Sequence, residues 1–222
     1  MIFPSLQGKK LGYINLNLEA KRWMTMQKVE VRKYKQNPLL DPVFCQEMVH
    51  AVHIKYGLDF SYGGWMEDRS FLWKGSYLDK EKNFVHLGVD LNVPSGTEIA
   101  ISFKAEVVKI DDDYPEDGGW GPRIIVKHLS RPVYFIFAHL DRGISCQNGD
   151  ILKVGDVFAK VGKAPQNGNW FPHLHVQTIS AEYYAELERT NTWSELDGYG
   201  IKNEIALNAT RFQDPLPFIT LH

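Results

Sequence analysis

From about Val85 onward, short runs of β-branched and aromatic residues alternate with turn residues, and this texture most strongly limits the possible fold. The expected strands cover residues 98–101, 105–110, 123–128, 133–139, 157–161 and 173–180. Glycine-, asparagine-, aspartate- or proline-rich turns separate them. Strands spaced this closely favour an antiparallel sandwich or barrel-sandwich over βαβ units. The fold class is therefore mainly β.

The chain before this region has a mixed character and predicts one clear helix, over residues 41–57. Asp41 can cap this helix, Pro42 suits its first position and Gly57 suits its end. Four residues recur at every fourth position and are expected to form its buried stripe: Phe44, Met48, Val52 and Tyr56. Residues 1–80 are thus predicted to be a partly helical N-terminal extension, and residues 81–222 the β domain.

The end of the chain adds two further expectations. Residues 181–189 read as a short helix that follows the last strand. Residues 212–219 read as an extended tail that could lie along the sheet.

The composition is that of a globular protein, with 222 residues, 44% hydrophobic and 23% charged. A formal charge of −2 gives no electrostatic reason to expect a nucleic-acid partner. The lysine- and arginine-rich first 35 residues favour a solvated basic face over a polyanion contact. No apolar run approaches the roughly 18 residues that cross a bilayer, so no membrane span is expected. The oligomeric state is left open.

The N-terminus has no basic segment leading into an apolar stretch, which predicts a cytoplasmic protein. A chain whose signal had been removed would look the same, and would be periplasmic or secreted. Cys45 and Cys146 could form a disulfide, but two free thiols are the favoured interpretation.

The candidate residues for a functional site are histidines and one aspartate. His86 and Asp90 stand four apart, His173 and His175 stand two apart, and His139 ends an apolar run. Zinc takes imidazole nitrogen and carboxylate oxygen, and a catalytic zinc keeps three protein ligands and one open position. On an extended strand, residues two or four apart share a face. His86 would then lie with Asp90, and His173 with His175. Each pair alone is weak, but together they predict a zinc site; spacing does not tell which of His173 and His175 binds.

These stretches resemble the lysostaphin/LytM-type zinc endopeptidases, which cut peptides of bacterial cell walls. The similar segments are 86–91, 94–100, 119–121, 137–140, 149–150 with 155–156, and 172–175, within roughly residues 84 to 180. The resemblance implies a LytM-like β domain with a site across one sheet. It also implies that His86, Asp90 and His175 bind Zn²⁺, and that His139 and His173 are the catalytic, non-ligating pair. The implied reaction is hydrolysis of a peptide bond by metal-activated water, on a peptide or peptidoglycan-like substrate.

Several positions depart from the common pattern of that family. Gln177 stands where many members have glutamate, and residues 167–171 replace a loop of small residues. With residues 64–69, these features resemble a subgroup without export signals, which calls a cell-wall substrate into question. Two alternatives follow: a catalytically silent binding or regulatory module, and a zinc hydrolase that acts on an amide outside the wall.

Other polar residues have simpler interpretations. His50 and His53, near Cys45, are favoured as helix-surface histidines over a second metal site, and His128 as structural. The acidic residues 111–113, 116 and 117 favour a solvated hairpin tip over a calcium loop. Trp120 and Trp170 could equally line a substrate groove or pack in the core. A further hypothesis places Asp59, Glu67 or Asp68 on the zinc as a blocking ligand.

Overall fold

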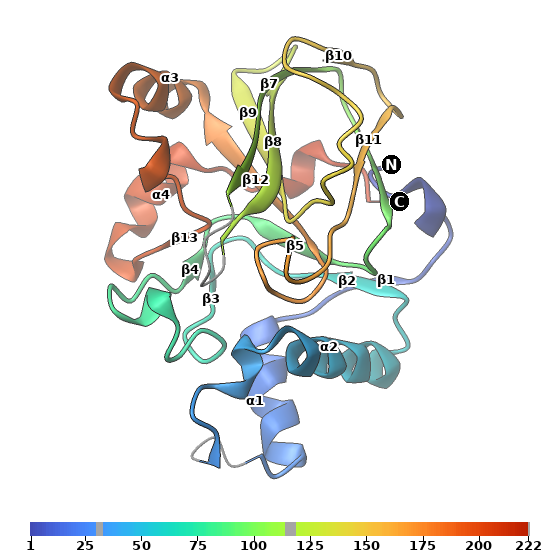
Figure 1. Cartoon of the computed structure of the whole chain (residues 1–222), viewed down its shortest axis with the longest axis vertical. Helices are drawn as coiled ribbons and strands as arrows, with labels where there is room; N and C mark the ends of the chain where they lie inside the picture. The colour runs from blue at the N-terminus through green and yellow to red at the C-terminus, as the bar shows by residue number, and fades with distance from the viewer. Residues whose placement is uncertain (30–32, 114–118, 222) are drawn as a thin grey trace.

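The computed structural model describes residues 1–29, 33–113 and 119–221. An eight-stranded sheet forms the centre of the molecule (Figure 1). Its spatial order is β1 (Leu11–Tyr13), β2 (Phe60–Tyr62), β5 (Val89–Asn92), β12 (Leu174–Ser180), β9 (Val133–Ala138), β8 (Gly121–His128), β7 (Ala105–Asp113) and β10 (Ile151–Leu152). All neighbours pair antiparallel except β1 and β2, which are parallel.

Two smaller sheets complete the β structure. One pairs β6 (Glu98–Ala100) with β11 (Val157–Lys160), and the other orders β13 (Tyr199–Gly200), β4 (Val85–His86) and β3 (Glu67–Asp68). The mainly β prediction is confirmed, and the six expected strands are β6, β7, β8, β9, β11 and β12. Within the described residues the sheets do not close into a barrel.

Both faces of the central strands are covered, because alternate residues enter different hydrophobic clusters. On β9, Phe135 and Phe137 join the cluster that includes Ile99 of β6 and Phe158 of β11. Ile136 and Ala138 join the opposite cluster. That second face is packed by α3 (Ala181–Thr190), the predicted C-terminal helix, and by the segment that follows α4 (Ile205–Arg211).

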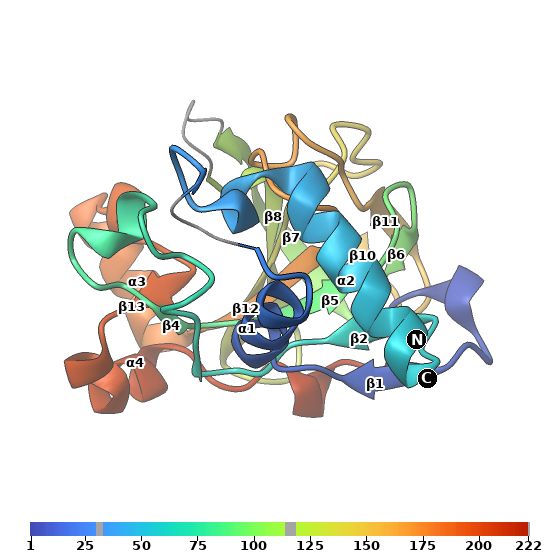
Figure 2. The same cartoon turned by 90° about the horizontal axis from the view of Figure 1, so that it is seen from below.

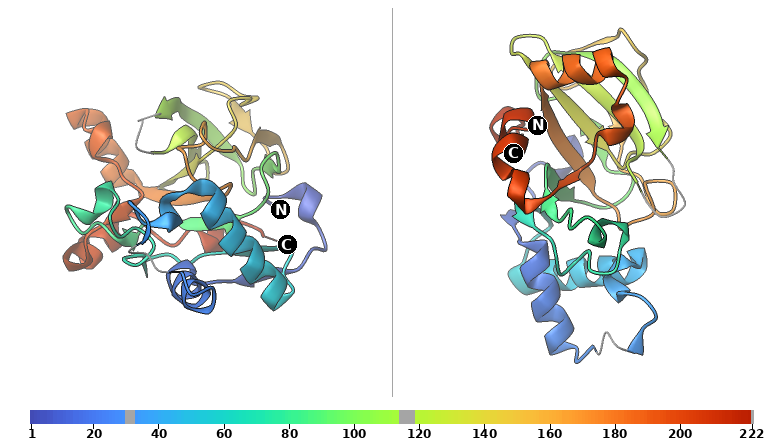
Figure 3. Two further views of the ribbon diagram at one scale, coloured as in Figure 1. Left: turned by 60° about the horizontal axis from the view of Figure 1, so that its bottom comes forward. Right: turned by 90° about the vertical axis from the view of Figure 1, so that its left-hand side faces the viewer.

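The extension contributes both helices and strands. Helices α1 (Leu16–Met26) and α2 (Pro42–Tyr56) lie in front of the sheet when the molecule is seen from below (Figure 2). They lie at the opposite end of the molecule from α3 (Figure 3). Strands β1 and β2 belong to the main sheet, and β3 pairs with β4.

Helix α2 begins and ends as predicted. Asp41 accepts hydrogen bonds from the backbone N–H groups of Val43 and Phe44, and Gly57 closes the helix in the left-handed conformation. The predicted stripe is partly wrong. Cys45, Met48, Val49 and Val52 are the buried residues, whereas Tyr56 is 41% exposed. The Tyr56 hydroxyl instead donates to Glu19 of α1, which keeps its ring at the surface.

The C-terminal tail is only partly extended. The backbone of Gln213 exchanges two hydrogen bonds with the Thr178 hydroxyl of β12, so the tail does lie against the sheet there. Leu216–Phe218 then form a 3-10 turn with proline in its first turn, and the extended prediction is wrong at that point. None of the helices in the described ranges has the length and apolar character needed to span a membrane.

Candidate functional site

Three predicted ligands meet beside the middle of the main sheet. His175 on β12 lies directly opposite Asp90 on β5. His175 Nδ1 is 3.0 Å from Asp90 Oδ1 and 3.1 Å from His86 Nε2, and His86 Nε2 is 3.3 Å from the same Asp90 oxygen. All three side chains are buried, and they are a group that could hold a metal ion.

The expectation that His86 and Asp90 share one extended strand is wrong. His86 ends β4 in the small sheet, whereas Asp90 belongs to β5 in the large one. The chain passes between the two sheets at Leu87 and Gly88. A side chain at Gly88 would place its Cβ 2.6 Å from both Cε1 and Nε2 of His175. Glycine is therefore required there because the His175 ring lies against the backbone.

The hydrogen bonds on the far side of each ring define which nitrogens face one another. His175 Nε2 lies 3.0 Å from Gln177 Oε1, and the Gln177 amide nitrogen donates to the Asp197 carbonyl. This second contact orients the amide, so Gln177 Oε1 accepts and His175 Nε2 donates. His86 Nδ1 faces the Gly64 carbonyl oxygen at 3.4 Å. In this tautomer the inner nitrogen of His175 has its lone pair directed at the Asp90 carboxylate, and the Gly64 contact favours the same arrangement for His86.

His139 and His173 lie together beside this group, with ring centroids 4.3 Å apart. His139 Nδ1 donates to the Asn167 carbonyl and His173 Nδ1 to the Phe171 carbonyl, each at 2.7 Å. A carbonyl oxygen can only accept, so the neutral form of each ring keeps its lone pair on Nε2. His173 Nε2 is 3.7 Å from Asp90 Oδ1.

The backbone at His139 has an unusual conformation. His139 follows β9 with φ of 63°, in the left-handed region that residues other than glycine rarely adopt. Its N–H donates to Trp120 O and its carbonyl accepts from Gly162 N, so both neighbours fix this conformation. Strain of this kind is typical of functional positions.

Burial dominates the electrostatics of the site. It lowers the pKa of His86 to about 3 and lowers the pKa of His173. Burial, with His173 and His175 nearby, holds the pKa of His139 well below its usual value. Burial alone would raise the pKa of Asp90, but His86 and Arg69 hold it well below its usual range. His86, His139 and His173 are therefore neutral, and Asp90 is a carboxylate, around pH 7.

A cavity of about 800 Å³ opens onto this group. Its floor includes Asp90, His139, His173 and His175, and its walls come from three parts of the chain. The extension contributes wall residues from Gln36 to Tyr77, loops of the β region contribute Trp120 and Trp170, and the C-terminal part contributes residues from Ser194 to Tyr199. Both tryptophans border the cavity while being over nine-tenths buried, so they line the pocket and also pack in the core.

Comparison with protein families gives one match, in which residues 84–186 fit the model of peptidase family M23. Residues 84–186 are called the M23 domain after this match. The lysostaphin/LytM-type resemblance is thereby confirmed. All five predicted site residues lie inside the M23 domain. No curated protein sequence matched.

Three of the solved structures that are similar to this chain are described as a peptidase or as the catalytic domain of one. A zinc-containing peptidase from Vibrio cholerae is 23% identical with a TM-score of 0.38, and the match covers 44% of this chain and 28% of that one. The catalytic domain of lysostaphin from Staphylococcus simulans is 21% identical with a TM-score of 0.42, covering 61% and 79%. The catalytic domain of the EnpA protein from Enterococcus faecalis is 24% identical with a TM-score of 0.38, covering 43% and 68%.

The three proposed blocking residues do not reach the candidate ligands. Glu67 accepts from Arg69 and from Tyr13, Asp68 accepts from the Ser70 N–H, and Asp59 accepts from the Lys10 N–H. Among the described residues, none of the three joins the His86, Asp90 and His175 group. The blocking hypothesis is therefore wrong.

The remaining polar residues behave as surface or packing groups. His50 is exposed, and His53 Nε2 lies 2.7 Å from the Ser61 hydroxyl. His128 stacks on Phe103, in agreement with a structural role. Both cysteines are free thiols.

The acidic run extends a strand instead of forming a hairpin tip. Residues 111–113 belong to β7, and Asp111 and Asp112 pair with Arg123 and Arg142. The tip prediction is wrong for these residues because β7 is longer than the sequence indicated. Glu116 and Asp117 lie outside the described residues.

Four residues around the M23 domain's polar group were not predicted from the sequence. Arg69 binds Asp90, while Trp73, Tyr77 and Tyr199 line the cavity. All four lie outside the family match. Arg69 ends the segment 64–69 that resembles a family subgroup, but that resemblance predicts no contact with the site, and the other three carry no periodic or motif signal. Their position depends on β3 and β13 pairing with β4, which brings distant parts of the chain to the site.

Proposed function

We propose that this protein is a zinc-dependent peptidase in which His86, Asp90 and His175 bind the metal and His139 and His173 act in catalysis. The observation that carries this proposal is the triangle of lone pairs, with sides of 3.0, 3.1 and 3.3 Å. Tetrahedral zinc with ligands at 2.0–2.1 Å separates neighbouring ligand atoms by about 3.3 Å. Two imidazole nitrogens and one carboxylate oxygen this close, in a buried place, form a favourable ligand set for a zinc ion.

A bound zinc ion supplies Lewis acidity, which polarises a peptide carbonyl and lowers the pKa of a water molecule from near 16 towards about 7. The protein's part is to receive and return protons. His139 and His173 each have Nδ1–H fixed on a backbone carbonyl and an unprotonated Nε2 at neutral pH. Either Nε2 can accept the proton of the attacking water and, once protonated, donate to the developing oxyanion or the leaving amine.

The cavity supports a peptide substrate of limited size. Its volume of about 800 Å³ lies within the roughly 300–1,000 Å³ range of small-molecule sites, so it suits a short peptide better than a polymer strand. A zinc hydrolase that acts on short peptides or amides is therefore a second candidate function beside a wall hydrolase. Both share the same metal chemistry.

Metal analysis and peptide hydrolysis test the proposal together. We expect about one zinc per purified chain and cleavage of glycyl or D-amino-acid-containing peptides. His173→Ala should lower kcat by roughly 10² to 10⁴, the usual contribution of a general acid–base group, and His86→Ala should lose the metal. His50→Ala, an exposed histidine on α2, is the matched control and should behave like the wild type.

Two outcomes would decide against this function. A wild-type protein that takes up no zinc, or a His86→Ala variant with unchanged activity, contradicts a metallopeptidase. A protein that binds zinc but cleaves neither peptides nor isolated cell walls would instead be a silent binding module. Comparable rates on soluble peptides and insoluble wall material would favour the wall hydrolase.

A further inference from the structure

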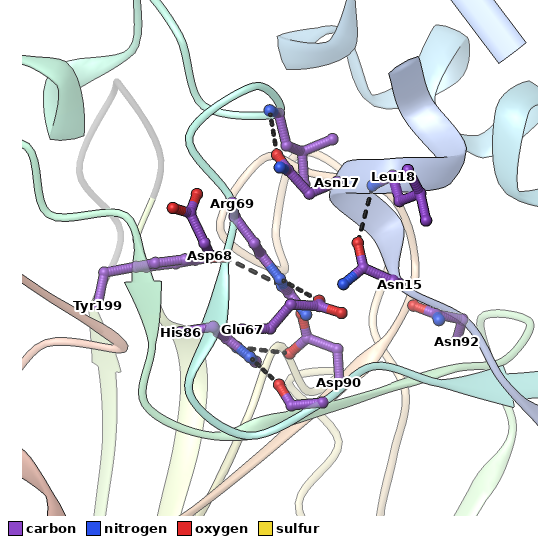
Figure 4. Close-up of polar contacts among 12 residues, drawn as sticks. Asn15, Asn17, Leu18, Glu67, Asp68, Arg69, His86, Asp90, Asn92 and Tyr199 are labelled. Atoms are coloured by element: carbon purple, nitrogen blue, oxygen red, sulfur yellow. Dashed lines mark hydrogen bonds and ion pairs between the residues drawn. The ribbon is translucent and has the colours of Figure 1, made fainter. Parts of the chain in front are cut away.

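Arg69 has a buried charge beside the candidate metal centre, although it precedes the M23 domain. Its side chain is 0% exposed, and it lies among Glu67, Asp90 and Tyr199 (Figure 4). Removing a guanidinium from water is costly unless charged and polar partners surround it. The burial of Arg69 therefore needs an explanation, and its contacts with the site provide one.

The first contact is with the proposed ligand Asp90. Arg69 Nη1 donates to Asp90 Oδ2, the oxygen that points away from the histidines. Asp90 Oδ1 faces His175 at 3.0 Å and His86 at 3.3 Å. Because Arg69 occupies one carboxylate oxygen, the other is held toward the lone pairs of the two rings.

The second contact offsets the positive charge. Arg69 Nε donates to Glu67 Oε2 at 3.2 Å, and both side chains are buried. Two carboxylates and one guanidinium leave the cluster of Glu67, Arg69 and Asp90 with more negative than positive charge. A buried cluster with net negative charge favours the binding of a divalent cation. Without Glu67, the positive charge of Arg69 would disfavour that binding.

The backbone around Arg69 supports the ligands as well. Gly63 N–H donates to Asp90 O and Met66 N–H donates to His86 O, both at 2.8 Å. The Gly64 carbonyl faces His86 Nδ1, and a side chain at Gly63 would lie 2.7 Å from Arg69 Nη2. The segment 63–69 therefore contacts both ligand-bearing strands.

Arg69 is not arranged for stability alone. Its Nη2 is buried and has no hydrogen-bond partner within the described ranges. Evolution retains an incompletely satisfied buried polar group chiefly where function requires it.

We propose that Arg69 is a positioning residue of the metal centre, which orients Asp90 toward the metal while Glu67 balances its charge. The centre is then built from the M23 domain together with the segment 63–69 of the extension. This inference rests on the proposed zinc-dependent function.

Zinc affinity, measured by competition with a chromogenic chelator on the full chain, tests this role without relying on activity. Loss of an outer partner of a ligand usually costs 10- to 100-fold in affinity, so Arg69→Met should raise the zinc Kd by about that factor. Arg69→Lys keeps the positive charge but loses the planar guanidinium. Its zinc Kd should lie between those of Arg69→Met and the wild type. With Co²⁺ in place of zinc, Arg69→Met should also change the visible spectrum, because Asp90 becomes free to bind through both oxygens.

Asn17→Ala is the matched control. Asn17 is buried and holds the same part of the extension by accepting from Phe71 N and Leu72 N, but it does not contact Asp90. This variant should lower the melting temperature and leave zinc affinity unchanged.

The outcomes separate this proposal from the proposed function. Wild-type affinity in Arg69→Met, or equal loss in Asn17→Ala, overturns the positioning role and leaves the metallopeptidase intact. A wild-type protein that binds no zinc overturns both. If Arg69→Met does not fold, Arg69→Lys and Glu67→Gln decide: both must weaken zinc binding, and unchanged affinity in both refutes the role.

Discussion

At the scale of single residues, the site depends on which proton each imidazole carries. His139, His173 and His175 each have one ring nitrogen 2.7 to 3.0 Å from an oxygen acceptor. Two of these acceptors are backbone carbonyls, and the third is the side chain of Gln177. The tautomer of His175 is therefore the one that a single substitution can change without altering the backbone.

Gln177→Leu should weaken zinc binding by about tenfold or more, because loss of a histidine's outer acceptor typically costs 10- to 100-fold. The variant leaves His175 Nε2–H unpaired and the ring free to turn. Gln177→Glu keeps an acceptor and should bind zinc at least as tightly as the wild type. Chelator competition measures both. Thr178→Val, which removes a buried hydroxyl bonded to Gln213, is the control and should affect stability only.

Gly88→Ala should disrupt the proposed metal centre by steric overlap alone. The added methyl would lie 2.6 Å from His175 Cε1 and Nε2 and from the Val176 carbonyl, so the ring must move. We expect lost peptide hydrolysis and weaker zinc binding. Gly143→Ala is the matched variant, because its methyl would meet only the end of the Asp141 side chain at 3.2 Å. Equal behaviour of the two variants in a zinc titration would contradict the packing argument.

At the scale of elements, the proposed ligands converge because neighbouring strands belong to different sheets. β4 and β5 are separated by Leu87 and Gly88, and this break turns His86 toward Asp90. β12 supplies His175 from the other side through its antiparallel pairing with β5. The helices serve a different purpose, since the 3-10 turn before α2 carries Leu40 into the cavity wall.

Asp41→Ala should destabilise the protein by about 1 kcal/mol, the usual cost of losing an N-cap. Asp41 accepts from Val43 N and Phe44 N, and no other group caps α2 at that end among the described contacts. Asp41→Asn keeps a hydrogen-bond acceptor and should lose much less stability. Urea unfolding measures the difference. We expect zinc affinity to stay unchanged in Asp41→Ala. A fall in zinc affinity would show that the stability of α2 is coupled to the proposed metal centre, contrary to this expectation.

The sequence predicts the elements whose pattern is local. Alternating and β-branched runs identify β7, β8, β9 and β12, and the cap residues identify α2. Strands β1, β2 and β3 are two or three residues long and exist only because a neighbour pairs with them, so no local signal marks them. Spacing groups His86 with Asp90 and His173 with His175, and the family resemblance adds His139. The structure places these side chains close together. The segment 64–69 resembles a family subgroup, but the contact of Arg69 with Asp90 could not be predicted, because arginines are nearly always exposed.

At the scale of the whole molecule, the site joins parts of the chain that are far apart in sequence. The predicted boundary near residue 80 stays a prediction, whereas β1 and β2 lie in the main sheet and Arg69 lies in the centre. Several ionisable groups are thereby buried together, which ties the stability of the fold to pH.

The metal-free protein should lose stability as the pH falls below about 6.5. An unfolded histidine binds a proton near pH 6.5, whereas burial lowers the folded pKa of His86 to about 3 and also lowers those of His139 and His173. The unfolded state therefore binds more protons in this interval, and stability, complete above it, declines toward acid. Asp90, with a lowered pKa, acts in the same direction; Glu67, whose pKa burial raises, acts in the opposite one.

Thermal unfolding of the chelator-treated protein between pH 8 and pH 5 measures this decline. Zinc should raise the melting temperature at pH 8 and lose that effect toward acid, because protons compete for the ligand nitrogens. A melting temperature that is constant across the interval would contradict the burial argument.

The cavity divides the molecule into two sets of residues with different freedom to change. Its floor is held by strands, by backbone acceptors and by Arg69, whereas much of its wall belongs to surface segments around residues 36–40, 73–77 and 194–199. Selection could exchange wall residues, and with them the preference for a substrate, without disturbing the proposed metal centre. For the same reason, a mutational library that seeks new substrates should vary these segments and leave the proposed metal centre unchanged.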